Sequence, residues 1–179
     1  MSPSDDLIDW TALARSLGTL TETGEHGGTN EAQAALIALL GPRQLEHAVD
    51  HYVDFRRGCE LARSVLWLLR PPAAMEHCMR IYREDPDLER RRAAVELLRV
   101  VADARALRWI DDFLSDPDGG IQNWGIGVLD QLVYSDLVAH EGPAVEALLV
   151  RAEAHESAYV REQARFIREM IASRGGRTE

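Results

Sequence analysis

Lysine is absent from this sequence, and all 20 of its basic residues are arginine. Cysteine is scarce, because Cys59 and Cys78 are the only two thiols, so a disulfide framework is excluded and both are expected to be reduced. No run approaches the ~20 apolar residues of a membrane span. Residues 1–6 lack the basic and apolar regions of a signal peptide. These absences predict a cytoplasmic protein that does not cross a membrane.

Recognisable chemical motifs are missing as well. There is no glycine-rich phosphate loop, Cys-x-x-Cys pair or Gly-x-Ser-x-Gly elbow. His77 and Cys78 are adjacent, so on a helix they point in different directions and are not expected to act together. His47 and His51 have the spacing of a shared zinc ion, but Ala48 stands where the hydrolytic motif His-Glu-x-x-His has its glutamate. The sequence therefore predicts no catalytic residue and no cofactor, and it leaves open whether His47 and His51 bind metal.

The net charge of −10 is unevenly distributed. Residues 1–50 carry a net −6, residues 51–115 a net +1 and residues 116–179 a net −5. A chain with acidic ends is a poor binder of polyanions, because phosphate binding needs many cations on one face. Acidity of this kind steers a protein towards a basic partner, although it also serves solubility alone.

A short pattern recurs in four helix-sized segments, which begin at Gly58, Arg90, Ile121 and Val160. Each segment has a small residue at a fixed point, an aliphatic residue three positions later and another seven positions later. The small residues are Ala62, Ala94, Gly125 and Ala164. Small side chains suit places where two helices cross closely, so Gly125 is explained by close packing or, alternatively, by a break in its helix. The recurrence predicts stacked helical hairpins with a shared core.

Alanine, leucine, arginine and glutamate dominate the composition, which favours helix. We expect helices at residues 6–20, 31–40, 42–55, 58–70, 72–84, 88–102, 104–115, 119–134, 143–154 and 157–173. Gly41-Pro42 is expected to end one helix and start another. The Asp-Pro-Asp tripeptides at 85–87 and 116–118 can each stop one helix and cap the next. The prediction is an all-α domain over residues 1–174, a superhelical stack of about five antiparallel helix pairs, with a disordered tail at 175–179.

The repeat spacing, the element Val160-Arg161-x-x-Ala164 and the two Asp-Pro-Asp tripeptides resemble HEAT repeats, which are helical hairpins stacked into a curved solenoid. The resemblance covers about residues 42–173. It implies binding of another protein, usually on the concave surface lined by the second helix of each hairpin. Arg91 occupies the position of Arg161, whereas Cys59 and Gln122 depart from that pattern.

Two segments, residues 155–171 and 123–133, are also similar to small bacterial immunity proteins, the HEAT-like partners of secreted polymorphic toxins. This resemblance implies a protein that neutralises a cognate toxin by binding it, with a basic toxin domain as the partner. Two other functions stay open: a nucleic-acid-binding enzyme of the HEAT-like glycosylase type, and a structural adaptor in a larger assembly. Nucleic acid is disfavoured, because the central third of the chain nets only +1.

Trp and Tyr side chains anchor protein interfaces well, although in small helical repeats they also fill the core. Trp124 lies near the expected concave face, and polar neighbours would line the same surface. The predicted partner-binding residues are Arg91, Arg92, Gln122, Asn123, Trp124, Asp130, Tyr134 and Arg161.

Overall fold

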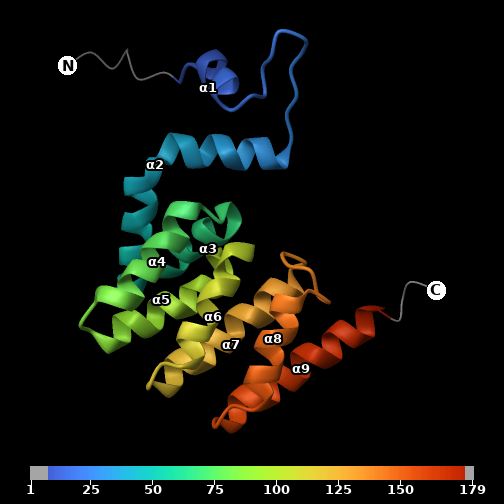
Figure 1. Ribbon diagram of the computed structural model, residues 1–179. Coiled ribbons are helices and arrows are strands. Elements are labelled where there is room, and N and C mark those ends of the chain that lie inside the picture. Colours follow the sequence, from blue (N-terminus) through green and yellow to red (C-terminus); the bar gives the residue numbers. More distant parts are fainter. Residues whose placement is uncertain (1–7, 176–179) are drawn as a thin grey trace.

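The computed structural model describes residues 8–175, and within them the chain is all-helical apart from one isolated β-bridge between Leu20 and Glu25 (Figure 1). The predicted all-α class is confirmed. The helices are α1 (Trp10–Ser16), α2 (Thr29–Val53), α3 (Cys59–Leu69), α4 (Pro72–Glu84), α5 (Leu88–Val101), a 3-10 turn η1 (Ala104–Ala106), α6 (Leu107–Leu114), α7 (Gly119–Tyr134), α8 (Pro143–Glu153) and α9 (Ala158–Gly175). The predicted tail at 175–179 lies almost entirely outside the described residues.

From the second half of α2 onward, helices that are neighbours in the sequence lie against one another. The second half of α2 lies against α3, and the pairs α4 with α5, α6 with α7 and α8 with α9 follow. The second helices of these pairs also lie against one another in the order α3, α5, α7, α9. Buried apolar side chains extend from Leu45 in α2 to Ile167 in α9 as one core. This arrangement places one side of each second helix in the core and leaves another side outside it.

Helix α2 is bent at Gly41, whose φ of 69° and ψ of 163° are not helical. Pro42 follows and lacks the backbone donor that a continuous helix would use. Figure 1 shows the two halves running in different directions. The sequence predicts this break, because glycine tolerates a positive φ and proline suits the first turn of the next helix.

The N-terminal region differs from the prediction. The expected helix over 6–20 is shortened to α1, which ends before Gly18 with its φ of +72°; residues 6 and 7 lie outside the described part. The sequence predicts that this helix packs with residues 31–40 as a fifth hairpin, yet neither α1 nor the first half of α2 buries a side chain. A helix of two turns followed by a glycine-rich polar segment offers too little apolar surface to hold that pairing.

The two Asp-Pro-Asp tripeptides form corners of the same design. Asp87 accepts a hydrogen bond from the backbone N–H of Glu89 at 2.9 Å, and Asp118 accepts one from Ile121 at 3.0 Å. In each corner the first aspartate accepts from the backbone N–H of the second at 2.9 Å. Each corner therefore caps the start of a second helix, α5 or α7, as the sequence predicts.

Candidate binding face

The consecutive arginines at the start of α5 form ion pairs and hydrogen bonds with other residues of the same chain. Arg92 donates from Nε and Nη2 to the two carboxylate oxygens of Asp118, at 2.9 and 2.6 Å. Arg91 donates to Asp116 Oδ2 at 2.8 Å and to the carbonyl of Tyr82 at 2.9 Å, with its guanidinium over the Tyr82 ring. Both arginines thus join α5 to the corner that precedes α7. Arg91 and Arg92 therefore have a structural role, and their role in binding a partner stays a prediction.

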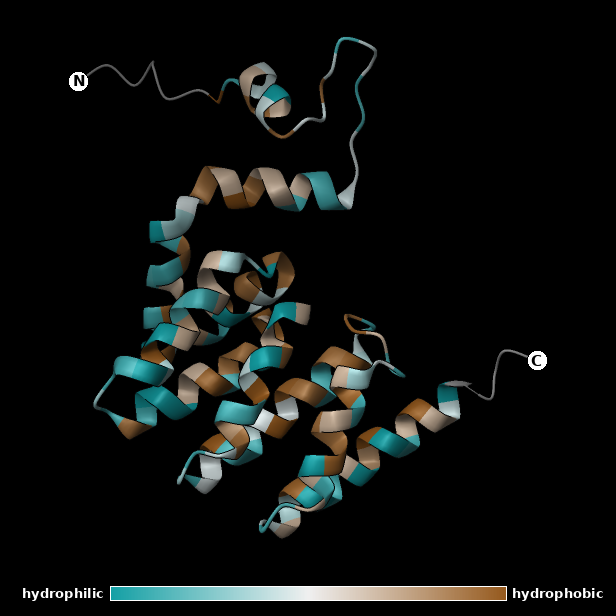
Figure 2. Ribbon diagram, viewed as in Figure 1, coloured by the Kyte–Doolittle hydropathy of each residue, from teal (hydrophilic) through white to brown (hydrophobic). Residues whose placement is uncertain are grey.

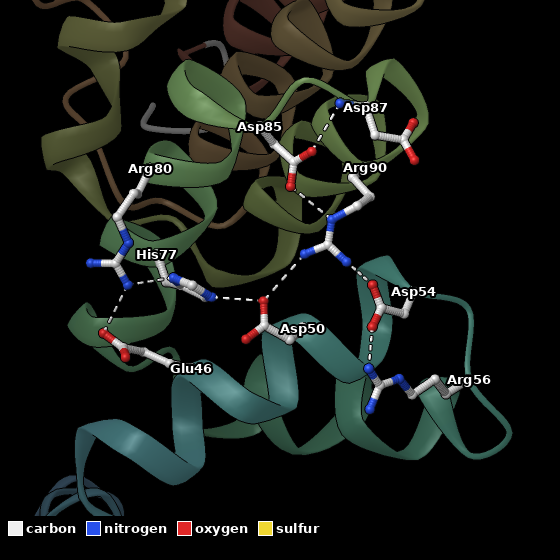
Figure 3. A network of polar contacts seen from close by, with 9 residues as sticks. All are labelled: Glu46, Asp50, Asp54, Arg56, His77, Arg80, Asp85, Asp87 and Arg90. Carbon is white, nitrogen blue, oxygen red and sulfur yellow. Dashed lines mark hydrogen bonds and ion pairs between the residues drawn. The ribbon is translucent and has the colours of Figure 1, made fainter.

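Arg90 contacts a different set of residues, in α2 and in the corner before α5 (Figure 3). Its Nε donates to Asp85 at 2.8 Å, and its other nitrogens contact Asp50 of α2 and Asp54, which directly follows α2. His77 of α4 lies 2.9 Å from Asp50 in the same network. The network holds five carboxylates, three arginines and one histidine, and its contacts join α2, α4 and α5.

Two further predicted residues also have partners within the chain. The side chain of Gln122 is buried and donates to the carbonyl of Asp116 at 2.8 Å. Arg161 donates to the carbonyls of His155 and Glu156, both at 2.7 Å, and so closes the turn before α9. These contacts within the chain explain why a glutamine and an arginine occupy the two positions, and the explanation needs no binding partner.

The remaining predicted residues lie on α7. Asn123 and Trp124 are half-buried, and the guanidinium of Arg99 lies over the Trp124 ring at 5.3 Å. Asp130 is also half-buried; burial raises the pKa of its carboxyl, and nearby Arg99 opposes the rise. Tyr134 is exposed, with Arg174 of α9 at 5.7 Å from its ring. The structure therefore gathers Trp124 and Asp130 around one arginine that the prediction had not selected.

A groove of about 290 Å³ crosses the second helices at this point. Its lining comes from α3, α5 and α7: Arg63, Ser64, Trp67, Arg99, Val100 and Gln131. Trp67 is 57% exposed, and Arg63 forms a long ion pair, of 3.7 Å, with Glu60. We call the six lining residues together with Trp124 and Asp130 the groove face.

Arg99 is the least satisfied member of the groove face. Its Nε is buried and finds no hydrogen-bond acceptor within residues 8–175. A buried guanidinium donor without a partner is costly, so contacts inside the described chain do not explain why an arginine stands here. The guanidinium is held in place by stacking on Trp124, so it is oriented before any partner arrives.

Sequence reasoning missed Arg99 and Trp67 as a pair, although the repeat holds the signal. Counting five residues on from Ala62, Ala94 and Gly125 gives Trp67, Arg99 and Asp130. Counting six gives Leu68, Val100 and Gln131. Positions of one repeat face the same way when hairpins stack, so this register would have identified the groove.

The histidine and cysteine candidates do not assemble into a reactive site in the described part of the chain. His47 and His51 have ring centroids 6.3 Å apart, and His51 Nε2 lies 2.9 Å from the carbonyl of Arg57. Residues 8–175 hold no group of three or more potential metal ligands. Cys78 is fully buried beside His77, and burial raises the pKa of its thiol.

Among residues 8–175, no helix combines the length and the hydrophobicity that crossing a bilayer requires. Comparisons of the chain with protein-family models, with curated proteins and with solved structures found no match.

Proposed function

We propose that this chain is a non-catalytic, HEAT-like module that binds another protein on the groove face. The observation that carries the proposal is Arg99, a prealigned arginine with a buried donor that lacks an acceptor among the described residues. Arginine and tryptophan are the side chains most enriched among the residues that dominate binding energy at protein interfaces. Trp67 supplies an exposed aromatic surface in the same groove.

The partner we favour is a basic toxin domain, with the chain acting as a bacterial immunity protein in the cytoplasm. The net charge of −10 supports this choice, because it accelerates encounter with a positively charged protein. The groove itself is basic, because Arg63 and Arg99 line it, and at close range these two side chains need hydrogen-bond acceptors from the partner. A basic toxin domain that places a backbone carbonyl or a single carboxylate in the groove would meet both the long-range and the short-range requirement.

The proposal is tested by capturing the partner from the native host and then measuring its affinity with purified proteins. Trp67→Ala and Arg99→Ala are each expected to weaken binding by at least about tenfold. Arg108→Ala is the matched control, because Arg108 is exposed, lies 5.0 Å from the Trp109 ring and belongs to α6, a first helix. Equal affinity for all three variants would place the binding site elsewhere.

Toxin neutralisation needs a separate readout. If the captured partner is a toxin, co-expression of the wild-type chain restores growth, and the Arg99→Ala chain restores it less. A partner that binds through the groove face but has no toxic activity would support the binding module and reject the immunity role. Retention on heparin that salt abolishes would instead favour a nucleic-acid ligand.

A further inference from the structure

Residues 8–40 form an N-terminal segment, here called the arm, that is unusually poor in buried side chains. It comprises α1 and the first half of α2, and none of its residues is buried. Several of its large apolar side chains are exposed, with Trp10 at 62%, Leu36 at 46% and both Leu39 and Leu40 at 40%, while Ile37 is half-buried against the core. Figure 2 shows hydrophobic residues along the first half of α2. Such a surface is expensive to leave in water.

A second apolar surface lies beside the arm on α3. Leu61, Val65 and Leu68 are spaced i, i+4 and i+7, so they share one side of that helix. They are 71%, 38% and 62% exposed. We call these three residues the α3 stripe. Helix α3 packs on α2 and α5 with other side chains, so the α3 stripe takes no part in the core.

Within one chain, the arm and the α3 stripe do not cover each other. Their polar link is a hydrogen bond from Gln33 Nε2 to the carbonyl of Leu68 at 2.7 Å. Leu36 and Leu40 stay exposed despite that link, as does the α3 stripe. The bend at Gly41 and Pro42 turns the arm away from the second half of α2.

The two surfaces are complementary in charge as well as in hydrophobicity. The arm holds four acids and one arginine, a net −3. Residues 54–70, which contain the α3 stripe, hold four arginines and two acids, a net +2, with Arg56 already paired to Asp54. One chain thus carries both halves of a matching interface, which is the condition for a reciprocal contact between two identical subunits.

We propose that a second copy of this chain is the occupant, with the arm of each protomer lying on the α3 stripe of its partner. The contact is isologous, so each pair of surfaces is used twice about a two-fold axis. The apolar side chains of both surfaces become buried, while opposite charges surround them. Gly41 is the hinge that lets the arm extend towards a neighbour instead of folding back.

Analytical ultracentrifugation of the full chain tests the proposal. The wild type is expected to reach twice the 20.0 kDa chain mass as its concentration rises from micromolar to submillimolar. Leu40→Asp in the arm and Leu61→Asp in the α3 stripe are each expected to weaken the dimer by at least about tenfold. Val150→Asp on α8, 54% exposed, is the control and keeps the wild-type value. All three sites are at the surface, and circular dichroism verifies that each variant is folded.

Mixing the two disrupted variants defines which surfaces meet. In a mixed dimer, the intact arm of the Leu61→Asp chain lies on the intact α3 stripe of the Leu40→Asp chain, so one contact is fully restored. One aspartate is expected to open its contact completely, so each homodimer keeps no intact contact whereas the mixed dimer keeps one. The mixture is therefore expected to dimerise more tightly than either variant alone. A wild-type chain that stays monomeric, a dimer unaffected by both substitutions, or a mixture no tighter than its components would each overturn the proposal.

Discussion

A Cβ atom built on Gly125 would lie 2.4 Å from the Cβ of Phe113. Phe113 belongs to α6 and Gly125 to α7, so these two residues set the closest approach of that hairpin. The atom in the way is a Cβ, which cannot swing aside by a side-chain rotation. Helix α7 runs unbroken through Gly125, so close packing, and not a break in the helix, explains this glycine.

Gly125→Ala is therefore expected to destabilise the protein by about 1–3 kcal/mol through overpacking. The higher helix propensity of alanine, worth about 1 kcal/mol, offsets part of the cost. Urea unfolding measures the difference. Gly119→Ala is the control, because no atom lies within 4 Å of its Cβ position. A Gly125→Ala chain as stable as the control would contradict the packing argument.

Arg91→Met is expected to cost about 2–3 kcal/mol of stability, because the side chain of Asp116 is only 4% exposed and would lose its guanidinium. The cost is below that of a fully buried pair, since Arg91 keeps some contact with water. Adding Asp116→Asn should recover part of the loss by removing the buried charge. Arg63→Met, whose ion pair is long, serves as the control. An additive double variant would rule out the coupling.

Stability should depend on pH through Asp118. Hydrogen bonding from Arg92 lowers the pKa of the Asp118 carboxyl from 3.8 to about 2. A lowered pKa in the folded state contributes stability above 3.8, and this contribution is lost as the pH falls towards about 2. The stability gap between wild type and Asp118→Asn should therefore narrow over that interval. Unfolding in urea at several acidic pH values measures the gap; a constant gap would argue against the linkage.

The two cysteines should differ in reactivity. Cys78 is fully buried, and burial raises the pKa of its thiol, whereas Cys59 is half-buried near the start of α3. A thiol reagent should label one cysteine per native chain and the second only after denaturation. The Cys59→Ser variant should then resist labelling until it unfolds. Rapid labelling of that native variant would mean that α4 opens readily.

Local signals in the sequence account for most helix boundaries. Pro72, Pro143 and the aspartates of the Asp-Pro-Asp corners act within one turn of the helix end, so the starts of α4, α5, α7 and α8 agree with the prediction. The start of the first predicted helix lies outside the described residues, while its end was placed too late. Its apolar spacing satisfies the helical pattern, but the sequence does not reveal that none of these side chains among the described residues becomes buried.

The candidate site was harder to predict, because it depends on contacts between distant segments. Arg92 meets Asp118, 26 residues away, only once α5 and α7 have stacked. From the sequence, the run of three arginines is equally compatible with an exposed basic patch. Arg99 is a candidate because its Nε is buried without an acceptor among the described residues and because its guanidinium lies over the Trp124 ring. Neither feature can be predicted from the local sequence. Only the repeat register carries a hint of the groove.

The three consecutive arginines at the start of α5 affect how the molecule unfolds. Arg90 is tied to α2 and to the corner before α5, while Arg91 and Arg92 are tied to the corner before α7. Side chains from a single helical turn therefore connect three successive hairpins. None of these hairpins can unfold separately without breaking charged contacts to the neighbouring hairpin. The middle of the chain should melt in one cooperative step, with loosening confined to its two extremities.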